Sequence, residues 1–169
     1  MRRIAAPCAL AILLCAGQAL AVAPQPVKPV AIGMYFGRWY QIAQIAKANP
    51  RRCPGATDDF FGGPGGRFAL VVTCHEPSGN TRQIRAKVSI VQGSGAAKFT
   101  MSFFGGLISQ EYWVIDHAPD QSWVLMATPG GNYLWLLARR PALAAPAHAA
   151  AVARIIALGY DASRLTVSR

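Results

Sequence analysis

Hydrophobic and polar residues alternate with a period of two in several segments between residues 38 and 139, most clearly over residues 67–75, 82–91 and 98–104. Glycine and proline clusters separate the alternating segments. The pattern predicts strands over residues 38–46, 56–61, 67–75, 82–91, 98–104, 111–117, 122–127 and 133–139. Eight sequential strands joined mostly by short turns indicate an all-β fold, an eight-stranded up-and-down antiparallel β-barrel, with a β-sandwich as the alternative.

After residue 139 the alternation ends and a helical pattern begins. Residues 143–158 are rich in alanine, and Val152, Ile155 and Ile156 fall on one helical face before Gly159. This predicts one C-terminal α-helix packed outside the barrel. A short final strand is expected over residues 164–167.

The N-terminus has the pattern of a secretory signal peptide. Two arginines precede an apolar run over residues 4–14, which is too short to span a bilayer as a helix. Cleavage is expected after Ala21 or Ala23, which both end Ala-x-Ala triplets. The chain therefore divides into a signal peptide (1–21), an extended proline-containing segment (22–32) and one folded domain (33–169).

Charge narrows the classes of partner. The chain has a formal net charge of +10, which becomes about +8 once the leader and its two arginines are removed. This charge favours binding to an anionic membrane surface. The alternative is that the charge only keeps the protein soluble. Because the basic residues are scattered and no nucleic-acid-binding motif is present, nucleic acid is not an expected partner.

Cleavage would leave two cysteines, Cys53 and Cys74. An even number in an exported protein predicts one disulfide, worth about 3 kcal/mol in the chain-entropy model. The alternative is a free thiol able to act as a nucleophile.

The sequence contains no strong motif for a catalytic or metal-binding site. The three histidines are far apart and lack ligand spacing, so no metal or cofactor is predicted. Asp58 and Asp59 are adjacent, so they point to opposite faces of a strand and make no catalytic pair. The favoured interpretation is a non-enzyme. The enzyme alternative depends on Cys53 or Cys74.

The predicted inward face of the barrel is the candidate ligand site. An eight-stranded barrel is wide enough to be filled by side chains or to hold one small ligand. The candidate residues are large and apolar: Phe60, Phe99, Met101, Phe103, Tyr133, Trp135 and Leu137. Ala43, on the face of Trp39, is expected to leave space beside them. This wall suits an acyl chain or another apolar ligand, and a solid core is the alternative.

Three motifs in order resemble the lipocalin family, in particular its bacterial outer-membrane group. Gly37-Arg38-Trp39-Tyr40 matches the Gly-x-Trp-Tyr signature of the first strand. Residues 102–105 followed by 112–116 resemble the passage from the fifth to the sixth strand. Residues 133–139 resemble the last barrel strand and end in the arginine typical of the family. The resemblance covers about residues 33–168.

The resemblance implies roles for these residues. Gly37, Trp39 and Arg139 would close the barrel, with the guanidinium lying across the indole. The open end would bind a fatty acid, a lysophospholipid or a similar molecule, in the storage, transport or repair of envelope lipids. The protein would be periplasmic and associated with the outer membrane. A Cys53–Cys74 bond is also a familiar feature of exported lipocalins.

Two departures from the family pattern bear on this interpretation. No cysteine of the leader follows a small residue, so a lipid anchor is not supported. The loop at residues 105–108 reads Gly-Gly-Leu-Ile, where the family would have a proline and an aromatic residue, and this loop helps to shape the barrel mouth. An envelope interaction protein with a filled barrel and a thiol-dependent lipocalin-type enzyme remain the alternatives.

Overall fold

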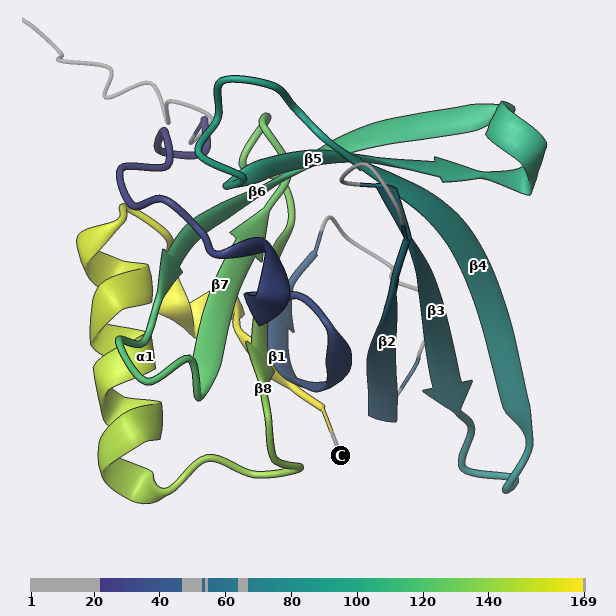
Figure 1. The fold of residues 1–169 in the computed structure, drawn as a ribbon. Helices are drawn as coiled ribbons and strands as arrows, with labels where there is room; N and C mark the ends of the chain where they lie inside the picture. The colour runs from purple at the N-terminus through teal and green to yellow at the C-terminus, as the bar shows by residue number, and fades with distance from the viewer. Residues whose placement is uncertain (1–21, 47–52, 54, 64–66, 169) are drawn as a thin grey trace, which may run out of the picture.

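Eight antiparallel strands close into a barrel with one helix outside it (Figure 1). The structure is a computed structural model that describes residues 22–46, 53, 55–63 and 67–168, so the predicted signal peptide lies outside the described residues. The barrel strands are β1 (Gly37–Ile45), β2 (Gly55–Gly62), β3 (Arg67–His75), β4 (Thr81–Ile90), β5 (Lys98–Phe103), β6 (Ile108–His117), β7 (Trp123–Ala127) and β8 (Leu134–Ala138). Because β1 pairs with both β2 and β8, the sheet closes on itself, and the predicted barrel is confirmed.

The strands lie where the alternation predicted them, and their ends shift by a few residues. The largest shift is at β6, which begins at Ile108 instead of residue 111. The cause is a longer β5–β6 hairpin, in which pairing continues to Phe103 opposite Ile108. A one-turn 3-10 helix, η3 (Phe104–Gly106), forms the tip of this hairpin.

A single turn of 3-10 helix, η1 (Ile32–Met34), precedes β1 at the closed end of the barrel. Next to it, the indole of Trp39 is 1% exposed and donates a hydrogen bond from Nε1 to the carbonyl oxygen of Tyr35, at 3.0 Å. The guanidinium carbon of Arg139 lies 3.7 Å from the centre of the Trp39 ring. The closure that the family resemblance implied is therefore present.

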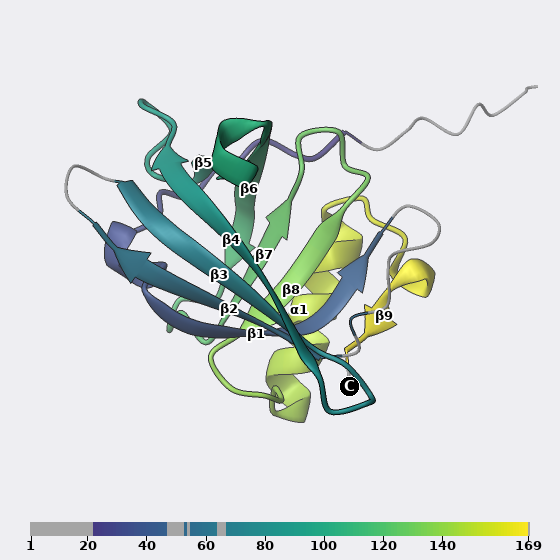
Figure 2. The same ribbon diagram turned by 90° about the vertical axis from the view of Figure 1, so that its right-hand side faces the viewer.

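Helix α1 (Ala145–Ala157) packs on the outside of the barrel, as predicted, through a face that includes the predicted Ile155 but not Ile156. Its buried residues are Ala151 and Ile155, whereas Ile156 is 58% exposed. Ala151 and Ile155 are four residues apart and therefore share one side of the helix, from which the neighbouring Ile156 points away. The short strand β9 (Thr166–Val167) pairs with β1 beside the helix (Figure 2).

The structure places Ala43 in the layer between barrel and helix, not in the barrel interior. Its side chain is fully buried in the same cluster as Leu136 and Ile155. The pairing of β1 with β8 shifts register between Gln41 and Ala43, and such a bulge moves the following residues to the opposite face. The expectation that Ala43 leaves space for a ligand is corrected for this reason.

A buried carboxylate joins three segments that are distant in the sequence. The side chain of Asp116, on β6, is 2% exposed and forms ion pairs of 2.5 Å with Lys28 and with Arg154. Burial alone would raise the pKa of Asp116, but hydrogen bonds from these two cations and from the His117 backbone lower it below its ordinary value. The N-terminal segment, the barrel and the helix are thereby held together.

Candidate functional site

A cavity of about 220 Å³ occupies the open half of the barrel. Its wall is mostly apolar. The apolar members come from five strands: Leu70 and Val72 on β3, Ile84 on β4, Met101 and Phe103 on β5, Met126 on β7, and Trp135 and Leu137 on β8. Gln41, Asp58 and Tyr112 are the polar members. An apolar wall with a few converging polar groups is typical of small-molecule sites.

The mouth of the cavity lies beside β4. This strand pairs with β5 only from Ala86 to Ile90, so its first half is not covered by β5. Ile84, in that first half, lines the cavity and is 40% exposed. The cavity therefore opens to solvent next to Ile84.

The closed half of the barrel is filled by aromatic side chains. The ring of Tyr35 lies 6.0 Å from Phe60, 5.4 Å from Phe68 and 5.3 Å from Phe99, measured between ring centres. The hydroxyl of Tyr35 donates to the carbonyl of Ala96, which fixes the ring. The sequence left open whether the barrel has a filled core or a ligand cavity. The closed half has a filled core, and the open half contains a cavity.

The predicted ligand residues divide among these environments. Met101, Phe103, Trp135 and Leu137 line the cavity. Phe60 and Phe99 belong to the filled half and lie outside the lining. Tyr133 is 38% exposed and stacks on Trp135 at 5.8 Å, outside the cavity wall. Tyr35 was not anticipated, because it comes before the first alternating segment.

Asp58 is the functional residue that the sequence argument missed. Its side chain lies in the cavity wall, Asp58 is 6% exposed, and its Oδ1 accepts a hydrogen bond of 3.0 Å from Gln41 Nε2. Asp59 points to the other face and pairs with Arg38 at 2.8 Å, which confirms that the two carboxylates are on opposite faces. The signal was available: Phe60 was predicted to face inward, and Asp58 is two residues before it on the same strand.

Burial in the cavity wall changes the pKa values of two side chains, Asp58 and Tyr112. Burial raises the pKa of Asp58 to about 7, with the Gln41 hydrogen bond opposing the rise. Burial likewise raises the pKa of Tyr112 to about 12, and the charge of Asp58 adds to that effect. Perturbed groups in a concave site are candidates for a functional role.

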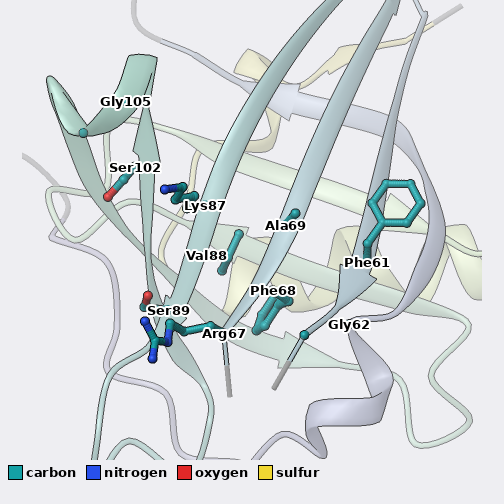
Figure 3. Close-up of a pocket in the computed structure, with 12 residues that line it drawn as sticks. Phe61, Gly62, Arg67, Phe68, Ala69, Lys87, Val88, Ser89, Ser102 and Gly105 are labelled. Carbon is teal, nitrogen blue, oxygen red and sulfur yellow. The ribbon is translucent and has the colours of Figure 1, made fainter. Parts of the chain in front are cut away.

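A second hollow, of about 890 Å³, lies on the outer face of β2, β3 and β4 (Figure 3). Figure 3 shows Phe61 on one side of it and Gly105, in the hairpin tip, on the other, with Lys87 on β4 between them. Arg67 also lines it, and the described lining residues include no carboxylate. The hollow is therefore a basic surface, distinct from the apolar cavity inside.

The sulfurs of Cys53 and Cys74 form the predicted disulfide. The bond joins Cys53, which precedes β2, to Cys74 near the end of β3, where Cys74 is opposite Ala56 of β2. A sulfur in a disulfide is not a thiolate, so in this state neither cysteine is a nucleophile.

Comparisons with known proteins agree with this architecture. The family model described as "Lipocalin-like domain" matches residues 30–169. The outer membrane lipoprotein Blc of Vibrio cholerae is 29% identical over 123 residues, which cover 70% of this chain and 71% of that protein. Temperature-induced lipocalin-1 of Arabidopsis thaliana is 24% identical over 154 residues, covering 82% and 78% of the two chains.

Among solved structures, insecticyanin from the tobacco hornworm Manduca sexta superposes with a TM-score of 0.69. The match covers 89% of this chain and 87% of that one at 15% identity. At this level of identity the similarity shows the fold.

The buried Asp58 predicts an unusual pH dependence of stability. Its folded pKa of about 7 lies above the unfolded value of 3.8, so the folded protein holds a proton that the unfolded chain has released. Stability therefore falls as the pH rises between these values, by on the order of 1.4 kcal/mol for each pKa unit. We expect Asp58→Asn to remove this dependence and to be more stable than the native protein at pH 8 by roughly 2–4 kcal/mol.

Urea unfolding of both proteins at pH 4 and pH 8 measures the effect. Asp59→Asn is the matched control, since it removes an outward-facing, partly exposed ion pair worth at most about 1 kcal/mol. Equal pH dependence of the native protein and Asp58→Asn would contradict the assignment of a raised pKa to Asp58.

Proposed function

The chain belongs to the lipocalin-like family, and from this premise we propose that it binds and carries a small hydrophobic molecule in the cavity at the open end of its barrel. The fold and the similarity to Blc support binding of small hydrophobic ligands. The finer proposal is a fatty acid, a lysophospholipid or a similar molecule, carried in the storage, transport or repair of envelope lipids. The observation that carries it is the apolar cavity lined by Met101, Phe103 and Trp135.

The size of the cavity limits the ligand. Its 220 Å³ correspond to the volume of about seven water molecules. Each buried methylene contributes about 0.8 kcal/mol, so a short chain or one ring system gains several kcal/mol before ordering costs are subtracted. A longer acyl chain would extend through the mouth beside Ile84, since the aromatic side chains around Tyr35 fill the space below.

The alternatives are less well supported by these contacts. The thiol-dependent enzyme lacks a nucleophile while Cys53 and Cys74 are bonded to each other. The hypothesis of an interaction protein with a filled barrel agrees with the aromatic packing in the closed half but not with the cavity in the open half. Lipocalins are in general binding and transport proteins, which fits the interpretation as a non-enzyme.

We also propose that the mature protein begins at Val22 and acts outside the cytoplasm, in the periplasm. Ala23 is 2% exposed, and its backbone N–H donates to the carbonyl of Pro129 at 3.1 Å. Cleavage after Ala21 keeps this contact, whereas cleavage after Ala23 removes it. In the part of the chain that the structure describes, no helix has the length and apolarity needed to cross a membrane.

The β5–β6 hairpin supports contact with an anionic membrane surface. At its tip Phe104 is 66% exposed, Leu107 is 87% exposed and Ile108 is 54% exposed. Lys87 pairs in register with Ser102 of the same hairpin, on the outer face that forms the basic hollow. Exposed apolar side chains beside cations are the arrangement that binds anionic lipid headgroups.

A bulky residue in the cavity is expected to block ligand binding. Val72→Trp places an indole in the cavity, because Val72 lines it, whereas Val71→Trp is the matched control on the outer face of the same strand. We expect Val72→Trp to weaken binding of the uncharged probe N-phenyl-1-naphthylamine by about tenfold or more, and Val71→Trp to leave it unchanged. Fluorescence titration measures both, with circular dichroism as the check of folding. Equal affinity of the two variants would place the ligand elsewhere.

The cleavage site is testable by mass. We expect protein secreted through the bacterial export machinery to have the intact mass of residues 22–169 with one disulfide. Protein that keeps residues 1–21 would contradict export by a cleaved leader.

Membrane contact is expected to depend on the hairpin tip. Leu107→Asp removes the most exposed apolar group and adds a negative charge, so it should reduce co-sedimentation with phosphatidylglycerol vesicles several-fold. Ile156→Asp, on the exposed face of the helix across the barrel (Figure 1), is the matched control. Loss of binding in both variants, or in neither, would rule out the tip as the contact.

A further inference from the structure

Among the described residues that line the cavity, Asp58 is the one with an acidic side chain, and none has a basic side chain. Lysine, arginine and histidine are absent from its described lining, which leaves Asp58 as the carboxylate among apolar side chains. Gln41 is the side chain that donates a hydrogen bond to it in the described structure, and a carboxylate has acceptor sites for several donors. A buried carboxylate with one neutral donor is incompletely compensated, so a cation entering the cavity would be stabilised there.

Aromatic rings extend this preference. Phe103, Tyr112 and Trp135 line the same cavity as Asp58, and the Tyr112 and Trp135 ring centres are 5.6 Å apart. Ring faces attract an ammonium group, most strongly where water is excluded. The rest of the wall is aliphatic or thioether and suits an apolar body.

A ligand carboxylate meets the opposite conditions. Inside the cavity it would face the like charge of Asp58 without a cation in the described wall to offset it. A fatty acid could avoid this only by placing its head outside the mouth, and its tail would then cover Asp58 without supplying a donor. A neutral alcohol would donate one hydrogen bond to Asp58 but would bring no opposite charge.

We infer that the cavity selects apolar molecules that carry a protonated amine, with the ammonium paired to Asp58 and the apolar body against Met101, Phe103 and Trp135. This inference rests on the proposed function, because it requires the cavity to be the ligand site. It narrows the ligand class towards amine-bearing lipids or small arylalkyl amines and away from free fatty acids.

Three probes with the same chain and different heads test the inference: octylamine, octanol and octanoate. At pH 8, titration calorimetry of the native protein should show octylamine binding about tenfold or more tighter than octanoate, with octanol between them. Asp58→Asn should weaken octylamine by about tenfold, leave octanol within about threefold, and strengthen octanoate. Asp59→Asn, which changes the neighbouring carboxylate on the outer face, should leave all three unchanged.

The outcomes separate the two proposals. The inferred preference for amines is wrong if octanoate binds as tightly as octylamine, or if Asp58→Asn leaves octylamine binding unchanged. Either result leaves the proposal that the cavity binds apolar molecules intact. If none of the three probes binds and N-phenyl-1-naphthylamine also fails to bind, the proposed function itself is wrong. Retained octanol binding shows that Asp58→Asn is folded and has an intact cavity.

Discussion

Closure of the barrel at Trp39 is the interaction on which the rest of the structure depends. The guanidinium of Arg139 covers the Trp39 ring and donates hydrogen bonds to the carbonyls of Met34, Phe36 and Arg38. A cation over a desolvated ring contributes roughly 2 kcal/mol, and the planar fork of arginine lets one side chain reach several carbonyls. This contact ties the end of β8 to the start of β1, the strand that must pair with both of its neighbours for the barrel to close.

The closed end determines how much of the interior remains for a ligand. Because η1 crosses the floor just before β1, Tyr35 enters the barrel and its ring packs among Phe60, Phe68 and Phe99. These buried rings occupy the lower half of the described interior. The cavity lies above them, and Met101 and Trp135 are part of its wall. The aromatic floor thus limits ligand length as well as stabilising the fold.

Short apolar or alternating segments separated by glycine and proline were enough to predict all eight barrel strands, including β7, which is buried on both faces. The family resemblance carried by the motifs around Trp39 and Arg139 implied the closure, and the cysteine count predicted the disulfide. Ala43 was misplaced because a β-bulge reverses alternation, and a bulge is fixed by pairing with β8 and not by local sequence. The helix face was predicted in part: Ile155 is buried as expected, but Ala151 and not Ile156 lies beside it against the barrel.

The place of Asp58 within the fold explains how the barrel accommodates a group that destabilises it. Asp58 is directly opposite Trp39 on β1, so its strand is held by the closure. On the other side, Asp58 is opposite Val72 of β3, two residues from Cys74, and the disulfide ties this end of the β2–β3 pair. Removing a carboxylate from water is unfavourable, so the surrounding structure must hold its strand in place. Here the strand is fixed on both sides, and the carboxylate is kept facing the cavity. The same constraints that stabilise the barrel therefore hold Asp58 in the cavity wall, where a bound molecule would contact it.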